Sequence, residues 1–333
     1  MVNRSGPLAI VGNLNVDLWV RPVDRFPGTD EEHIVESARV ELAGTAGYAL
    51  HACSALGLDA VTISTIGEDA LGRLILQAAE ELSVPLDGTE VLSGRETPLS
   101  MVFIGSDGSR SIMSTLGAHA DMDMDVVMRH DADIAKCSEL FICGSYLLPR
   151  LGPADIHEYA QVAQGRGQTV VFDPSWDPSG WGGRVRRETA ALLSNVDIYM
   201  PNAQELVQLT GRLQWEDAAR EVIGIPGELV IKRGAEGACY VTADDWVEVP
   251  GFEIEAINTI GAGDVFDMGY LYARRMRWSP RQRLEFACAV GAIVVSQTGM
   301  RKYPTASAVQ SFLQERLGTE RWGPVGPAAL ESG

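Results

Sequence analysis

The residues best suited to catalysis by their type and spacing lie in one short segment, residues 259–264 (Thr-Ile-Gly-Ala-Gly-Asp). Its two glycines allow unusual backbone angles and close approach of another molecule, and the helical pattern that follows directs its first amides at whatever binds there. An aspartate in such an anion site could take a proton from a hydroxyl while the amides stabilise a transferring phosphoryl group. A glycine-rich helix start, in which the aspartate only compensates the helix dipole, is the alternative. The expected catalytic groups are Asp264, Gly261, Ala262 and Gly263.

Apolar strands and helices alternate along the chain around this segment. A strand is expected at residues 8–11, a second at 14–20, and a helix at 48–56 that leads into a strand at 60–66. This alternation predicts a mainly parallel sheet that is covered on both faces. The same pattern continues with expected strands at 140–143, 169–172, 197–200 and 229–232, and expected helices at 154–164, 184–193 and 203–209.

Two regions interrupt this rhythm. Residues 29–42 and 97–113 alternate between polar and apolar residues, and the second contains an Asp-Gly pair that favours a hairpin turn. We expect them to form a small antiparallel sheet that projects from the main domain, with its strands within about 14–42 and 97–113. One domain is expected over residues 1–318, and a flexible tail over 319–333.

Composition limits the classes of partner. The 333 residues include 27 basic and 45 acidic side chains, a formal net charge of −18. Nucleic acid and anionic lipid normally bind to basic surfaces, so we exclude both as partners. An acidic protein that handles an anionic ligand must supply positive potential locally, from amides, metal ions or a few placed cations.

The cysteines and the N-terminal region indicate a cytoplasmic protein. Five cysteines are scattered along the chain without a Cys-x-x-Cys pair, which is typical of reduced core thiols. The first apolar run is interrupted by Asn and Asp too early for a signal peptide or a membrane span. We therefore expect a cytoplasmic location.

The motifs resemble those of the ribokinase/PfkB family of carbohydrate and nucleoside kinases. The C-terminal signature of that family is D-T-x-G-A-G-D-x-F-x-x-G, and residues 258–269 read N-T-I-G-A-G-D-V-F-D-M-G. Further motifs follow in the family's order over about residues 8–312. The resemblance implies a ribokinase-like three-layer α/β/α fold with a mainly parallel central sheet and a small antiparallel β lid. It also implies an ATP-dependent kinase that transfers the γ-phosphoryl group to a hydroxyl of a sugar or sugar-like molecule, with Asp264 as the base.

The resemblance assigns substrate binding to two segments near the N-terminus. Residues 12–17 resemble a strand turn whose aspartate binds sugar hydroxyls, a task that suits a carboxylate. Residues 43–50 occupy the place of the motif G-G-x-x-x-N-x-A, with Ala43 for the first glycine and Tyr48 for the asparagine. Tyr48 could stack on a ring, shorten the pocket or turn into the core. The expected substrate-binding residues are Asn15, Asp17, Gly44, Thr45 and Tyr48.

The same resemblance assigns ATP and Mg²⁺ to the second half of the chain. Asn202 and Glu205 match an N-x-x-E motif that organises magnesium through water, although a helix-capping pair would look the same. Residues 232–237 resemble the K-x-G-x-x-G nucleotide segment, whose glycines a plain hairpin would also explain, and residues 287–292 lie near the family's adenine site. The expected cofactor-binding residues are Asn202, Glu205, Lys232, Gly234, Gly237 and Cys288.

Two departures leave alternatives open. The first Asp of the family signature helps to hold a monovalent cation, and here it is Asn258, which brings no charge, so we expect weak activation by K⁺. A nucleoside kinase in which Tyr48 stacks on the base is one alternative, and a catalytically impaired kinase-like binding protein is another. A Rossmann dehydrogenase is disfavoured because no G-x-G-x-x-G follows the first strand. Lid sheets in this family often pair between subunits, so a homodimer through the lid is considered.

Overall fold

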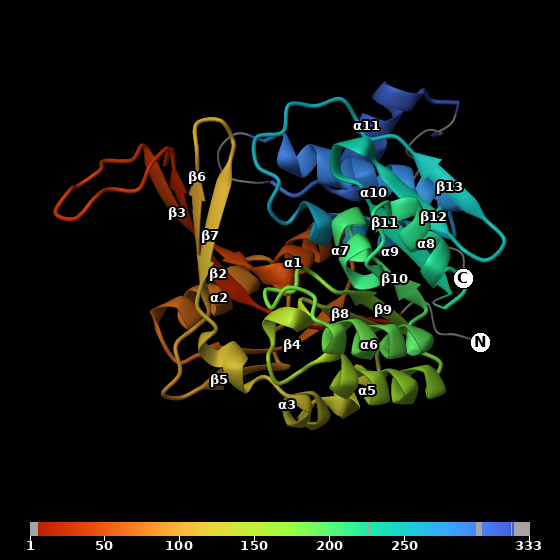
Figure 1. The fold of residues 1–333 in the computed structure, drawn as a ribbon, viewed down its shortest axis with the longest axis horizontal. Helices are drawn as coiled ribbons and strands as arrows, with labels where there is room; N and C mark the ends of the chain where they lie inside the picture. The colour runs from red at the N-terminus through yellow and green to blue at the C-terminus, as the bar shows by residue number, and fades with distance from the viewer. Residues whose placement is uncertain (1–5, 226, 298–301, 321, 323–333) are drawn as a thin grey trace.

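A nine-stranded sheet runs through the centre of the molecule in the order β13-β12-β11-β10-β9-β8-β1-β4-β5 (Figure 1). The structure is a computed structural model and describes residues 6–225, 227–297, 302–320 and 322. Neighbouring strands from β5 to β11 run parallel, and the last two pairs, β11–β12 and β12–β13, run antiparallel. The strands are β1 (Leu8–Gly12), β4 (Ala60–Gly67), β5 (Thr89–Leu92), β8 (Glu139–Cys143), β9 (Thr169–Asp173), β10 (Ile198–Tyr199), β11 (Glu228–Lys232), β12 (Ala238–Val241) and β13 (Trp246–Val249).

Helices cover both faces of this sheet. Side chains of β1 alternate between two apolar clusters, because Leu8 and Ile10 pack into one and Ala9 and Val11 into the other. The first cluster contains α1 (Gly44–Leu56), α2 (Ala70–Glu81), α9 (Ala262–Arg275), α10 (Pro280–Val295) and α11 (Ala306–Leu317). The second contains α3 (Met124–Arg129), α4 (Asp131–Ile134), α5 (Pro153–Gly165), α6 (Gly183–Leu192), α7 (Ala203–Thr210) and α8 (Trp215–Val222). Strands that are buried on both faces read as continuous apolar runs, which is why the sequence identified them.

A four-stranded sheet, here called the lid, projects from the main body in the order β3-β2-β6-β7 (Figure 1). Its strands are β2 (Asn15–Arg21), β3 (Ser37–Ala43), β6 (Leu99–Ile104) and β7 (Arg110–Ser114). The β2–β3 and β6–β7 pairs are antiparallel, and β2 and β6 run parallel. Trp19, Val102 and Ile104 on its inner face pack with Tyr48 of α1 and with Ile260. The lid therefore closes over the region that precedes α9.

The predicted fold class is confirmed, and most predicted strands coincide with observed ones to within one residue. Only the last part of 29–42 is a strand, because residues 22–36 lie in the loop between β2 and β3. Most of the proposed tail, 319–333, lies outside the described residues. Trp322 is described, is buried, and donates a hydrogen bond from its indole nitrogen to Glu285 at 3.1 Å. The division of the chain at residue 318 stays a prediction.

All five cysteines are free thiols, and four of them are buried. Within the part of the chain that the structure describes, none of the helices combines the length and the apolar character needed to cross a membrane.

Candidate active site

The start of α9 lies beside the carboxyl ends of the central strands. Gly261 precedes the helix in the left-handed region, with φ of +73°, and no side chain caps this end. A Cβ at Gly261 would lie 2.6 Å from Cγ of Tyr48, so only glycine fits here. The Ala262 amide donates to the Thr259 carbonyl at 3.3 Å, and the Val265 amide begins the helical ladder. The segment thus forms the uncapped helix start that the sequence predicts, which favours an anion.

The carboxyl of Asp264, in the first turn of α9, lies among charged groups from four other elements. Burial raises its pKa well above the usual range, and the charge of Asp173 raises it further. Lys232 lowers this pKa, whereas Glu205 and Asp17 add to the increase. An aspartate with a raised pKa is a better proton acceptor once it is ionised. Residues from distant parts of the sequence therefore act together on the candidate base.

Lys232 is the buried cation of this cluster. Its Nζ lies 2.9 Å from Oδ2 of Asp173, which ends β9, and 3.0 and 3.1 Å from the two carboxylate oxygens of Asp267 in α9. Burial alone would lower the pKa of Lys232, but the charges of Asp173 and Asp267 outweigh it and raise this pKa. The ammonium therefore stays charged inside the protein.

The predicted substrate residues come together at the junction of the lid and α1. Nδ2 of Asn15 donates to Oδ1 of Asp17 at 2.9 Å, and Thr45 donates from its hydroxyl to Oδ1 of Asn13 at 2.5 Å. Gly44 has φ of +84°, and a Cβ there would lie 2.4 Å from the Asn13 carbonyl oxygen. Asp17 itself is only 4% exposed. Its carboxylate is thus held by neighbours in a fixed orientation, as reading substrate hydroxyls requires.

Tyr48 turns inward and joins this group to the start of α9. It is 3% exposed, and its hydroxyl donates to Oδ2 of Asp17 at 2.5 Å. Its ring lies against Gly261. Of the orientations that the sequence left open, the structure has the ring in the protein interior with its polar end on the substrate segment.

Comparison with known proteins shows the family of the chain. A model of the pfkB family carbohydrate kinases matches residues 7–306. The chain belongs to this family. The resemblance inferred from the motifs and the predicted class of enzyme, a carbohydrate kinase, are confirmed.

Relatives and solved structures agree with this assignment. The chain is 28% identical to an ATP-dependent ribose-1-phosphate kinase of Halopiger xanaduensis, over 92% of this chain and 97% of the relative. It is 27% identical to a ribokinase of Arabidopsis thaliana, over 89% and 78% of the two chains. A putative ribokinase II from E. coli, solved in complex with ATP and Mg²⁺, has the same fold with a TM-score of 0.80 at 20% identity, covering 93% of this chain and 99% of that one.

Asn202 and Glu205 form the start of α7 in the kinase. The Asn202 amide donates to Oε2 of Glu205 at 2.8 Å, and the Glu205 amide donates to Oδ1 of Asn202 at 2.9 Å, so the pair is a helix cap. Burial, with the charge of Asp173, raises the pKa of Glu205 to about 7. Among the described residues, Oε1 of Glu205 accepts no hydrogen bond. A buried carboxylate with one oxygen available fits Mg²⁺, which prefers oxygen ligands and keeps its waters.

The remaining nucleotide candidates lie in the β11–β12 hairpin and in α10. Gly237 has φ of +97°, and a Cβ there would lie 2.1 Å from the Val249 carbonyl oxygen, so the hairpin itself requires this glycine. Gly234 has φ of +58° and open space beside it. Cys288 packs half-buried on α10, and burial raises the pKa of its thiol to about 12. The nucleotide roles of Gly234, Gly237, Cys288 and Lys232 stay predictions.

Asn258, the candidate for a monovalent cation, lies in the loop before α9. Its Oδ1 accepts a hydrogen bond from the Ile260 amide at 3.1 Å, and its own amide donates to the Val295 carbonyl. Across the described ranges, no set of three or more His, Cys, Asp or Glu side chains is arranged to hold a metal ion. The role of Asn258 stays a prediction.

Two residues of the charged cluster, Asp173 and Asp267, were not predicted as site residues. Asp173 is the last residue of the buried strand β9, and Asp267 lies one helical turn after Asp264 among apolar neighbours, with no exposed surface. A carboxylate in an apolar run needs a partner when it is buried. That local conflict was the available signal, but it did not reveal Lys232 as the partner.

Proposed function

We propose that this protein is an ATP-dependent kinase that transfers the γ-phosphoryl group to a hydroxyl of a sugar or sugar-like molecule. The observation that carries the proposal is that Tyr48 joins Asp17 to the start of α9, since its hydroxyl donates to Oδ2 of Asp17 and its ring lies against Gly261, three residues before Asp264. Asp17 is placed to read hydroxyls, Asp264 to accept a proton, and the amides of Gly261, Ala262 and Gly263 to stabilise an anion. Relatives named as ribokinase and ribose-1-phosphate kinase support the same chemistry.

In the proposed mechanism, Asp264 accepts the proton of the acceptor hydroxyl as that oxygen attacks the terminal phosphorus, and the bond from this phosphorus to the bridging oxygen breaks to release ADP. Glu205 and Asn202 would hold the Mg²⁺, which supplies positive charge to the phosphates when it is bound with ATP. The lid excludes water and so limits hydrolysis of ATP. Tyr48 supports the acceptor site from within by orienting Asp17.

A substrate panel tests this function. Purified protein with ATP and Mg²⁺ is assayed for ADP release against sugars, sugar phosphates and nucleosides, with the Asp264→Asn variant as background. We expect release with at least one sugar or sugar phosphate. Release with nucleosides alone would establish the nucleoside kinase instead, although the inward orientation of Tyr48 leaves little of its ring to stack on a base. Nucleotide binding without turnover would establish the impaired binding protein.

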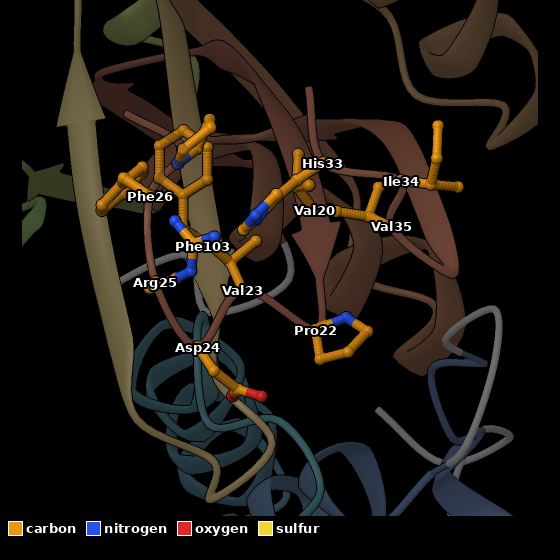
Figure 2. A pocket seen from close by; sticks show the side chains of 11 residues that line it. Val20, Pro22, Val23, Asp24, Arg25, Phe26, His33, Ile34, Val35 and Phe103 are labelled. Carbon is orange, nitrogen blue, oxygen red and sulfur yellow. The ribbon is translucent and has the colours of Figure 1, made fainter. Parts of the chain in front are cut away.

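We also propose that two copies pair through the outer face of the lid. Val20 and Phe103 are register partners on that face, where Val40 and Met113 are 46% and 50% exposed. The loop between β2 and β3 folds beside them and encloses a pocket of about 290 Å³ (Figure 2). An exposed apolar face of this kind favours association. Phe26 is an exposed residue of this loop whose ring lies against Phe103. Light scattering should give a dimer mass that Phe26→Asp reduces, whereas Val162→Asp, at an exposed apolar position on α5, should leave it unchanged.

The cytoplasm is the proposed location. Free cysteines throughout the chain are typical of a reducing compartment. Fractionation of the native cells should recover the protein with cytoplasmic markers, and recovery in a secreted or periplasmic fraction would contradict this.

A further inference from the structure

Lys232 is held by carboxylates of two separate elements beside the proposed base. Its contacts to Asp173 and Asp267 are 2.9 to 3.1 Å long, and Asp267 has no exposed surface. The backbone of Lys232 is also fixed, because its amide donates to the Pro201 carbonyl at 3.0 Å, next to Asn202. The end of the β11 strand is thus tied to β9, to α9 and to the start of α7.

The ammonium lies directly under the anion site. A Cβ at Gly263 would lie 3.5 Å from Nζ of Lys232, and Asp264 is the next residue. Asp267 follows Asp264 by three residues, so the two carboxylates lie on neighbouring positions of one helix face. From this position, the Lys232 ammonium could pair with either of two carboxylates on α9, that of Asp264 or that of Asp267.

The two sites have opposite consequences for catalysis. A carboxylate that is paired directly with an ammonium is a poor proton acceptor, because the pair stabilises its ionised form. An ammonium held nearby by other carboxylates still supplies positive potential to a transferring phosphoryl group. The geometry therefore favours an arrangement in which Lys232 is bound away from Asp264.

We propose that Asp267 is a positioning residue that, together with Asp173, binds Lys232 beside Asp264 but not on it. This rests on the proposed kinase function. The charge of Lys232 then offsets the negative potential around Asp264 without forming a direct ion pair with this base. The groups that face Asp264 are Asp17 from β2, Asp173 from β9, Glu205 from the start of α7, Lys232 from β11 and Asp267 from α9. Of these, Lys232 lowers the pKa of Asp264, whereas Asp173, Glu205 and Asp17 raise it.

The Asp267→Asn variant tests the proposal. Lys232 loses one carboxylate partner and should turn toward Asp264. We expect kcat to fall by about 10- to 100-fold at saturating ATP and acceptor, with the acidic limb of kcat moved to lower pH. The KM values for ATP and acceptor should stay near those of the wild type. Asp197→Asn, which removes a half-buried carboxylate that binds Gln164 and the Val170 amide, is the matched control and should retain kcat.

A double-mutant cycle separates positioning from loss of structure. In a Lys232→Met background, no ammonium is left to reach the base, so Asp267→Asn should change kcat far less than it does in the wild type. Each variant is checked for folding by circular dichroism. If Asp267→Asn does not stay folded, Asp267→Glu keeps the charge but displaces the carboxylate, and should lower kcat with the same movement of the acidic limb.

Three results would overturn the proposal. The first is a kcat and pH profile of Asp267→Asn, or of Asp267→Glu in its place, equal to those of the wild type. The second is an equal effect of Asp267→Asn in both backgrounds, which would indicate a purely structural role. The third is a raised KM for ATP at unchanged kcat in Asp267→Asn, which would make Lys232 a phosphate ligand. A wild-type protein that phosphorylates no acceptor would instead refute the kinase function, and this inference with it.

Discussion

The hydroxyl of Tyr48 donates a 2.5 Å hydrogen bond to Oδ2 of Asp17, while the ring of Tyr48 lies against Gly261. One side chain therefore connects the carboxylate proposed to bind the acceptor with the glycine that begins the proposed anion site. Because Tyr48 is buried, both contacts are held in place by the packing of Trp19, Val102 and Ile104. Tyr48, which stands in place of the asparagine of the family motif, thus contacts both Asp17 and Gly261.

Removing the Tyr48 hydroxyl should weaken acceptor binding. In Tyr48→Phe, buried Asp17 loses a hydrogen-bond donor, a loss of about 1–3 kcal/mol, which corresponds to a rise of about fivefold or more in the KM for the acceptor. Steady-state kinetics with varied acceptor and varied ATP measure this, and the KM for ATP should change little. Tyr159→Phe, on α5, removes a similar bond to Asp131 of α4 and is the matched control. Equal effects of the two variants on the acceptor KM would contradict the assignment.

Replacing the proposed base should affect turnover far more than binding. For Asp264→Asn we expect kcat to fall by at least about 10²–10⁴-fold, because the amide cannot accept the hydroxyl proton. ATP binding, measured by calorimetry, should stay largely intact. Turnover close to that of the wild type would show that another group is the base.

The contact between Arg110 and Thr259 should control closure of the lid. Arg110 is on β7, and its guanidinium hydrogen-bonds the Thr259 hydroxyl just before the anion site. Arg110→Ala should lower kcat/KM for the acceptor by about threefold to tenfold and raise ATP hydrolysis without acceptor, since water enters an open site. Arg25→Ala, which breaks an ion pair with Glu31 within the loop between β2 and β3, is the control. An unchanged ratio of hydrolysis to transfer in Arg110→Ala would argue against this role.

Buried His119 should make stability depend on pH. Its Nε2 accepts a hydrogen bond from the Leu14 amide at 3.1 Å, and burial lowers its pKa to about 4. Between pH 4 and its ordinary value of 6.5, the unfolded chain binds more protons than the folded one, so stability rises with pH across this window. One such proton contributes at most about 1.4 kcal/mol per pH unit.

Urea unfolding at several pH values measures this contribution. From pH 7 to pH 5, the wild type should lose more stability than His119→Gln. His33→Gln, at an exposed position in the loop between β2 and β3, should behave like the wild type. Parallel curves for the wild type and His119→Gln would mean that His119 is not neutral in the fold.

Asn258 should limit the response to potassium. Its amide oxygen could ligate a cation but brings no charge, and it already accepts a hydrogen bond from Ile260. Replacing Na⁺ by K⁺ should therefore change kcat little in the wild type and more in Asn258→Asp. Strong activation of the wild type by K⁺ alone would show that other ligands hold the cation.

The sequence by itself determined the fold class and the approximate location of the candidate site. Apolar strands and helices alternate because a parallel sheet is buried on both faces, and this pattern is local and readable. The segment ending in Asp264 and the pair of Asn202 and Glu205 are also local, since each lies at the start of a helix. Glycines and the spacing of capping residues make such sites recognisable in the sequence.

Only the tertiary structure decided which side chains meet. Lys232 is 59 residues from Asp173 and 35 from Asp267, and Tyr48 is 31 residues from Asp17. Whether a buried cation faces a phosphate or a carboxylate depends on how α9 packs against the ends of β9 and β11, and the direction of an aromatic ring depends on the space its neighbours leave. Local sequence carries neither distance nor direction between such elements, so these contacts become definite only when the chain is folded.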